Sequence, residues 1–403
     1  MKIRIGIYNL HMQAKGGGEK RTLALAEHLS RSCQVWLFVN EPLDLTALER
    51  YFGVDLSRVK VVVLNEARRL DGRARRRFRA DRWDALAAQR DHFLQIKALK
   101  LDVFINNSHY SNLPCPAAAG IYMCMFPHAL RSQVGAESFP RRAYHSLMDR
   151  VERRAIGCPG AQSIGTYAAV TANSCFTAEW VRKMWGRRSE VIYSACDSMG
   201  PVAADKEKII LNVGRFIVGG GGTLYKRQEV LLDVFNRLTD IHADGWQLHF
   251  AGSVARDAES SALAARLKDA ARGRPVFFHF DADLDALRDL YRRAALYWHA
   301  TGYGFPAQEY PVLQEHFGIT TVEAMSAGAV PLVINSGGQR EIVAHAADGF
   351  LWERLPALAD HTVRLIDDEG LMKRLSRQAV LSSARFSRAA FNAGVDLIIE
   401  RLM

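Results

Sequence analysis

Two carboxylates eight positions apart, Glu315 and Glu323, enclose a segment whose residue types suit the binding of an anion. Glu315 precedes a predicted helix and Glu323 is expected in its first turn, so both can face a ligand held over the helix start. Gly318 lets a ligand approach the backbone closely. The N–H groups of residues 319–321 have no partner within the helix and can bind a phosphate. The alternative is that Thr320-x-x-Glu323 is a capping box that only starts a helix.

Two cations form a second candidate group. Arg215 follows the predicted strand 209–213, and Lys226 is expected to open the next helix. A departing diphosphate needs fixed positive charge where negative charge develops. Arginine supplies a planar, bidentate fork and lysine a point charge. The alternative is that both are ordinary surface cations.

A glycine loop forms the third group. Gly16, Gly17 and Gly18, followed by Glu19, lie between the predicted strand 3–8 and a predicted helix. Glycines let a ligand reach the N–H groups of a helix start. The loop is not a G-x-G-x-x-G motif, which argues against a dinucleotide-dependent dehydrogenase. By itself it also fits a simple turn.

The scaffold for these loops is an alternation of short apolar runs with helical segments. Such a pattern predicts parallel sheets covered on both faces by helices. In these sheets, ligands bind beyond the carboxyl ends of the strands. We expect two doubly wound, Rossmann-like α/β units, at 1–195 and 207–385, a linker at 196–206 and a last helix at 386–403 that packs back on the first unit. The predicted strands are 3–8, 34–39, 59–64, 102–106, 121–126, 170–173, 191–193, 209–213, 247–251, 276–280, 296–299 and 331–334.

Composition narrows the class further. The 403 residues are 49% hydrophobic and 24% charged, which is typical of globular proteins. No apolar run reaches the roughly 18 residues of a spanning helix, and no secretory signal is recognisable, so a cytoplasmic location is expected. The cysteines lack zinc-ligand spacing. Asp281-Ala282-Asp283 follows a predicted strand and could bind a metal, but it reads more simply as the cap of the next helix.

The net charge of +10 is partly concentrated in residues 68–82, which hold eight arginines and two aspartates. Such a run can bind an anionic membrane surface, or it can be a solvated helix face. Nucleic acid is disfavoured as a partner because no recognition motif accompanies the charge.

Taken together, these segments resemble the retaining glycosyltransferases of family 4, which have the GT-B fold. The E-x7-E signature of the family is matched by Glu315 and Glu323, and its glycine loop by Gly16, Gly17 and Glu19. Its G-R-F segment and downstream lysine are matched by Gly214, Arg215, Phe216 and Lys226. Four glycines lengthen the stretch between the arginine and the lysine, so Arg227 rivals Lys226.

The resemblance implies a role for each matched residue. Arg215 and Lys226 would contact the donor diphosphate, Glu315 the transferred sugar and Glu323 the ribose. His128 would approach the sugar as the active-site histidine; as a lone histidine after a strand it could equally be structural. The residues implied to bind the rest of the donor are Gly16, Gly17, Gly214, Phe317, Gly318, Ile319 and Thr320.

The expected activity is a hexosyl transfer from a nucleotide-diphosphate sugar, with retention of configuration and without a metal or cofactor. The resemblance favours GDP-mannose as donor and a glycan, lipid-linked in this interpretation, as acceptor, with attachment to the cytoplasmic membrane face. The alternatives are a UDP-sugar donor with a soluble acceptor, a sugar-nucleotide epimerase or polysaccharide synthase of the same fold, and a non-catalytic nucleotide-sugar-binding subunit.

Overall fold

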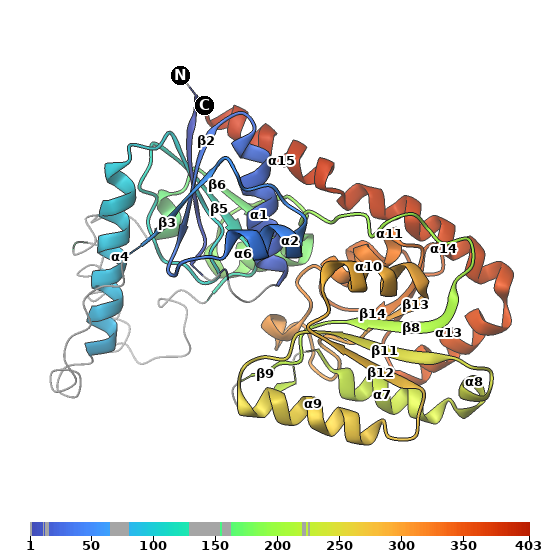
Figure 1. Cartoon of the computed structure of the whole chain (residues 1–403). Helices are drawn as coiled ribbons and strands as arrows, with labels where there is room; N and C mark the ends of the chain where they lie inside the picture. The colour runs from blue at the N-terminus through green and yellow to red at the C-terminus, as the bar shows by residue number, and fades with distance from the viewer. Residues whose placement is uncertain are drawn as a thin grey trace. The chain divides into compact units, whose positions relative to one another are not determined.

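The computed structural model describes residues 2–10, 12, 16–64, 80–128, 154, 163–219, 223–224 and 226–403. The chain folds as two compact units, each built around a parallel sheet (Figure 1). Unit 1 comprises Met1–Tyr193 and Phe391–Met403, and unit 2 comprises Ser194–Ala390.

The segment 196–206, which the sequence indicated as a linker, is part of unit 2. The Met199 N–H donates to Ser326 Oγ. The Lys206 ammonium donates to the carbonyl oxygens of Arg292 and Ala327, at the ends of two helices.

In unit 1, the described strands form a seven-stranded sheet in the order β3-β2-β1-β4-β5-β6-β7, and all neighbours are parallel. The strands are β1 (Arg4–Tyr8), β2 (Gln34–Val39), β3 (Val59–Val63), β4 (Val103–Asn106), β5 (Ala119–Cys124), β6 (Ala169–Ala172) and β7 (Glu190–Val191). The helices are α1 (Gly17–Ser30), α2 (Leu45–Phe52), α4 (Ala80–Ala98), the 3-10 turn Ser163–Thr166, α6 (Cys175–Trp185) and most of α15 (Arg388–Leu402).

The strands of unit 1 are short apolar runs because both faces of the sheet are covered. One face packs Phe38, Phe104 and Tyr122 against Phe93 of α4 and Trp185 of α6. At the start of α6, the Ser174 hydroxyl accepts the Thr177 N–H and caps the helix.

In unit 2, a six-stranded sheet has the order β12-β11-β8-β13-β14-β15, again with parallel neighbours, beside a small β9-β10 hairpin. The strands are β8 (Glu207–Val213), β9 (Val218–Gly219), β10 (Thr223–Leu224), β11 (Gln247–Gly252), β12 (Val276–Phe280), β13 (Ala294–His299), β14 (Val330–Ile334) and β15 (Phe350–Trp352). The helices are α7 (Gln228–Arg237), α8 (Thr239–Ala243), α9 (Ala258–Ala270), α10 (Leu284–Arg293), the 3-10 turn Pro311–Leu313, α11 (Ile319–Ser326), α12 (Gln339–Ile342), α13 (Leu355–Asp367), α14 (Glu369–Ser383) and the 3-10 turn Ala384–Phe386.

The unit 2 sheet is sandwiched between two helix layers. Helix α7 packs beside α9 and α13, and α11 packs beside α10 and α14 (Figure 1). The core between the sheet and α7 holds Phe250, Trp298 and Phe235, all fully buried.

The winding reverses once in each sheet. In unit 1 the chain moves from β1 outward to β2 and β3, then returns to start β4 on the other side of β1. In unit 2 it moves from β8 to β11 and β12, then returns to start β13 beside β8. Side chains beyond the carboxyl ends of such a strand pair face a crevice where ligands bind. The predicted pair of doubly wound units is confirmed; β15 and the β9-β10 hairpin were not predicted.

Candidate active site

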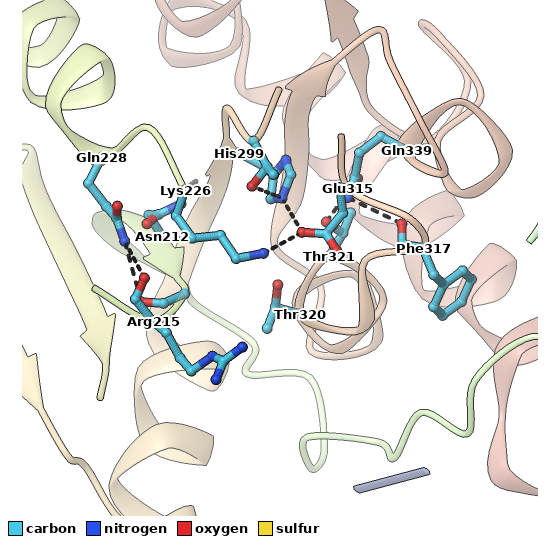
Figure 2. Close-up of polar contacts among 12 residues, drawn as sticks. Asn212, Arg215, Lys226, Gln228, His299, Glu315, Phe317, Thr320, Thr321 and Gln339 are labelled. Atoms are coloured by element: carbon cyan, nitrogen blue, oxygen red, sulfur yellow. Dashed lines mark hydrogen bonds and ion pairs between the residues drawn. The ribbon is translucent and has the colours of Figure 1, made fainter. Parts of the chain in front are cut away.

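Arg215 lies at the reversal point of unit 2, directly after β8. Its neighbours are tied into the fold: the Gly214 N–H donates to the Ala251 carbonyl at 2.9 Å, and Phe216 is fully buried. The Gln228 amide donates to the Arg215 carbonyl at 3.2 Å, while the Arg215 side chain is exposed and extends away from Gln228 (Figure 2). A fixed backbone therefore presents a solvated guanidinium.

Lys226 and Glu315, predicted to act on one ligand, are in direct contact. Lys226 Nζ lies 2.6 Å from Glu315 Oε2 (Figure 2). The rival Arg227 is held elsewhere, with its Nε 2.9 Å from Glu229 Oε1 and its guanidinium over the ring of Phe305. Of the two cations, Lys226 is the one that reaches the Glu315 carboxylate. It precedes α7, which begins at Gln228, by two residues.

His299 is a further member of this cluster, and the sequence interpretation did not assign it a role. It closes β13, is 2% exposed, and its Nε2 lies 3.2 Å from Glu315 Oε2. Burial lowers the pKa of its ring, although the adjacent carboxylate opposes that shift. A lone histidine at a strand end is a weak signal; its place next to β8 becomes evident only from the strand order.

The Glu315 carboxylate is strongly held in its ionised form. Burial alone would raise its pKa, but the Lys226 ammonium and the His299 ring outweigh burial and hold the pKa well below its ordinary value. A carboxylate in this state only accepts hydrogen bonds, so it can bind the hydroxyl groups of a ligand.

The loop 315–318 is shaped by two glycines from the turn after β14. The Gly338 N–H donates to the Glu315 carbonyl at 2.7 Å. A Cβ on Gly338 would lie 2.5 Å from the His316 carbonyl, and one on Gly337 would lie 2.3 Å from that of Glu315. This close backbone contact leaves no room for a side chain at either position.

Gly318 is the N-cap of α11 and has φ of +121°, a conformation that favours glycine. The Gln339 side chain fills the space beside it: its Oε1 accepts from Thr321 Oγ1 at 2.9 Å and its amide lies 3.4 Å from the Phe317 carbonyl. The Thr320 hydroxyl meets the Tyr297 hydroxyl at 2.7 Å.

Two expectations for α11 need correction. Because the helix begins at Ile319, Glu323 lies in its second turn, and the capping box considered for Thr320 and Glu323 does not form. The Thr321 N–H donates to the Gly318 carbonyl at 3.1 Å, so it is not presented to a ligand. The N–H groups of Ile319 and Thr320 remain at the helix start.

Glu323 is more enclosed than Glu315. It is 5% exposed, and the phenol of Tyr291, itself fully buried, donates to its Oε2 at 3.0 Å. Tyr291 thus orients this carboxylate from α10.

In unit 1, Gly16 is the N-cap of α1 and Gly17 its first residue. The Glu19 carboxylate turns back and accepts the Gly16 N–H at 2.9 Å. His128 lies after β5, with its Nε2 2.7 Å from Asn112 Oδ1 and its carbonyl accepting from the Trp185 indole. Burial, with a smaller effect from His109, lowers the pKa of the His128 ring.

The remaining candidate residues either have a structural role or lie outside the residues that the structure describes. Asp283 caps α10 by accepting the Ala286 N–H at 2.9 Å. Across the described ranges, no group of three or more His, Cys, Asp or Glu side chains could hold a metal ion. The arginines of 68–82 lie outside the described side chains. No helix in the described part of the chain has the length and apolar character needed to cross a membrane.

Family models match the two halves of the chain in succession. Residues 15–198 match the model for Glycosyltransferase Family 4, and residues 199–381 match the model for Glycosyl transferases group 1.

Curated relatives match part of the chain. It is 25% identical over 246 residues to a GDP-Man:Man(3)GlcNAc(2)-PP-Dol alpha-1,2-mannosyltransferase of Yarrowia lipolytica, an alignment that covers 56% of this chain and 36% of that protein. The protein of the same name from Mus musculus is 26% identical over 251 residues, covering 58% and 48%. The chain thus matches less than half the length of these relatives.

Among solved structures, an Anabaena protein, HepE, in complex with UDP and glucose superposes with a TM-score of 0.66 at 15% identity, covering 99% of both chains. That likeness concerns the fold alone, and it agrees with the GT-B fold expected from the sequence. With family models matched from residue 15 to residue 381 and a shared GT-B fold, this chain belongs to the glycosyltransferases, as an enzyme with a family 4 N-terminal half and a group 1 C-terminal half.

Proposed function

We propose that the protein transfers a hexose from a nucleotide-diphosphate sugar to a glycan acceptor, with retention of configuration and without a metal ion. The observation that carries this proposal is the contact of Lys226 with Glu315 beyond the reversal point of unit 2, beside the exposed Arg215. In a nucleotide-diphosphate sugar the diphosphate adjoins the sugar. A lysine that would bind the diphosphate and a carboxylate that would bind a sugar hydroxyl are in contact here.

Unit 2 supplies the groups that such a donor requires. Arg215 and Lys226 would bind the diphosphate, since an ammonium that donates one hydrogen bond to Glu315 keeps two more donors. The N–H groups of Ile319 and Thr320 would add to this at the start of α11. Glu315 would accept a hydroxyl of the sugar.

Glu323, held by Tyr291, would accept a ribose hydroxyl. The backbone of Gly214, Phe317 and Gly318 would line the donor. The roles of Gly16, Gly17 and His128, in unit 1, stay predictions.

In the proposed reaction, the bond between the anomeric carbon and the phosphate oxygen breaks as charge develops on the diphosphate. Arg215 and Lys226 stabilise that charge, as preorganised cations do at other leaving groups. The acceptor oxygen bonds to the anomeric carbon on the same face, and its proton passes to the departing phosphate oxygen. No carboxylate acts as a nucleophile and no metal takes part in the proposed reaction.

GDP-mannose is the first donor to test, because the curated relatives carry that donor in their names. A lipid-linked acceptor is proposed on the same ground. Attachment to an anionic membrane through residues 68–82 stays a prediction.

The test is a panel of GDP- and UDP-sugars scored for thermal stabilisation and for slow donor hydrolysis, with and without EDTA. We expect one donor to stabilise the protein and to release the α-anomer of its sugar from an α-linked donor, with EDTA having little effect. Binding without any hydrolysis or transfer would favour the non-catalytic subunit. Loss of activity in EDTA that Mg²⁺ restores would contradict the metal-independent part.

A further inference from the structure

The two oxygens of the Glu315 carboxylate are in different situations. Oε2 accepts from Lys226 Nζ at 2.6 Å and lies 3.2 Å from His299 Nε2. None of the described residues donates to Oε1. Oε2 is held by a lysine just before α7 and a histidine at the end of β13, and Oε1 is left to accept from a ligand.

The hydrogen position on His299 follows from this arrangement. The Glu315 carboxylate is ionised and only accepts, so His299 Nε2 must carry the hydrogen between them. Thr301 Oγ1 lies 3.1 Å from the same nitrogen. Nδ1 is buried and has no hydrogen-bond partner in the described structure. A second proton, on Nδ1, would therefore have no acceptor, and this agrees with a neutral ring.

We propose that His299 is a positioning residue: its Nε2–H, together with Lys226, fixes the Glu315 carboxylate so that Oε1 is presented to a hydroxyl of the sugar donor. The identity of that hydroxyl rests on the proposed function; the positioning does not.

His299 has a task that Lys226 cannot perform alone. The Lys226 side chain is flexible and 27% exposed, so its contact is adaptable, and binding of a diphosphate would compete for its hydrogens. The His299 ring is 3% exposed at the end of a buried strand, so its direction is fixed. The histidine keeps the carboxylate in place when the ammonium is drawn toward phosphate.

The test uses the ionisation of Glu315 rather than turnover. In protein labelled with ¹³C at the glutamate carboxylates, Glu315→Gln identifies the Glu315 resonance by its absence. His299→Phe removes the donor and keeps a ring. We expect the titration midpoint of Glu315 to rise by about one pH unit or more in this variant, because burial is then opposed by one group fewer.

Among the residues that the structure describes, the charged and titratable groups that face Glu315 are Lys226, His299 and the phenol of Tyr297, which burial keeps protonated. Lys226 and Tyr297 are unchanged in every variant, so a shift reports the histidine. His299→Gln, whose amide N–H can take the place of Nε2–H, should return the midpoint toward wild type. An unchanged midpoint in folded His299→Phe, or a His299→Gln midpoint equal to that of His299→Phe, overturns the proposal.

If His299→Phe does not fold, His299→Asn and His299→Gln give the matched pair. Both are small polar amides, but only the longer one reaches Oε2. We expect a wild-type-like midpoint for Gln and a raised midpoint for Asn; equal midpoints overturn the proposal.

Turnover separates this proposal from the proposed function. With an active donor, we expect His299→Phe to lower kcat about tenfold or more, with a much smaller change in KM, since a misplaced carboxylate affects the reacting geometry. Recovery in His299→Gln supports positioning. If the wild type turns over no nucleotide sugar, the proposed function fails, while the titration still decides the role of His299.

Discussion

The two reversal points of the molecule have the same topology but different chemistry. In unit 1, between β1 and β4, the hydroxyl of Thr22 accepts from Asn9 Nδ2 and from Asn107 Nδ2, each at 2.7 Å. The same hydroxyl donates to the Gly18 carbonyl at 2.8 Å. This cluster consists of neutral amides and a hydroxyl that bind one another.

In unit 2, between β8 and β13, the corresponding position holds charge. Lys226 and His299 meet on Glu315, and Arg215 is exposed beside β8. Winding alone brings loops together at each reversal point, but the side chains there differ: neutral groups that bind one another in unit 1, and charged groups that can bind an ionic ligand in unit 2.

The largest effect is expected for Arg215→Ala. Its exposed side chain contributes little to folding, whereas loss of one charge-stabilising group costs about 10²–10³ in kcat. Steady-state kinetics with the active donor and a thermal melt measure both quantities. Arg266→Ala, which removes an exposed arginine from α9, is the control and should keep wild-type kcat. Near-normal turnover in a folded Arg215→Ala protein would show that the charge at this reversal point is not used.

Thr22→Val should show the opposite pattern to Arg215→Ala, with its main effect on stability. Two buried amide N–H groups lose an acceptor, each at about 1–3 kcal/mol, so we expect the free energy of unfolding to fall by about 2–6 kcal/mol. Urea unfolding measures this loss. Thr22→Ser keeps the hydroxyl and should be much milder. If Ser and Val cost the same, packing of the methyl group, rather than hydrogen bonding, stabilises the unit 1 cluster.

The helix starts beside the two reversal points should also differ. Gly318→Ala places a Cβ 2.2 Å from Gln339 Nε2 at φ of +121°, so we expect a loss of about 1–3 kcal/mol in stability and weaker donor binding. Gly16→Ala is the matched control for stability alone, because Gly16 has an extended backbone with φ of −107° that alanine adopts readily. Equal losses in the two variants would mean that the conformation of Gly318 is not under constraint.

The most gradual effect is a pH dependence in unit 2, which is small over any single pH unit. His249 of β11 stacks on His279 of β12, and burial, followed by that neighbour, lowers the pKa of His249 to about 4 from 6.5. As the pH falls, the unfolded chain therefore binds the proton before the folded protein does. The free energy of unfolding has its full value above about pH 6.5 and decreases by about 1 kcal/mol per pH unit toward pH 4. Urea unfolding at a series of pH values should show a smaller slope for His249→Gln. Parallel curves for variant and wild type would contradict this assignment.

Much of the fold could be predicted because buried parallel strands are continuous apolar runs. The predicted runs 34–39 and 276–280 coincide with β2 and β12. The three-residue β15 and the two-residue strands of the hairpin were missed, because strands this short show no recognisable hydrophobic period.

At the site, local spacing correctly placed Glu315 before a helix, but it placed Glu323 in the first turn of that helix, whereas α11 begins at Ile319 and Glu323 lies in the second turn. The contacts of Gly338 and His299 with Glu315 join residues from different loops. No local pattern predicts such contacts; they become visible only with the strand order and the turn after β14.

The division of the chain has a consequence for its synthesis. Unit 1 includes Phe391–Met403, whose Phe391, Val395 and Ile398 are buried, and Asp396 of the same helix binds His28 at 2.7 Å. A ribosome makes these residues only after all of unit 2. Residues 1–193 therefore lack part of their core packing until all of unit 2 has been synthesised. The domain that begins first is completed second, so its exposed surface during translation is where a chaperone would be needed.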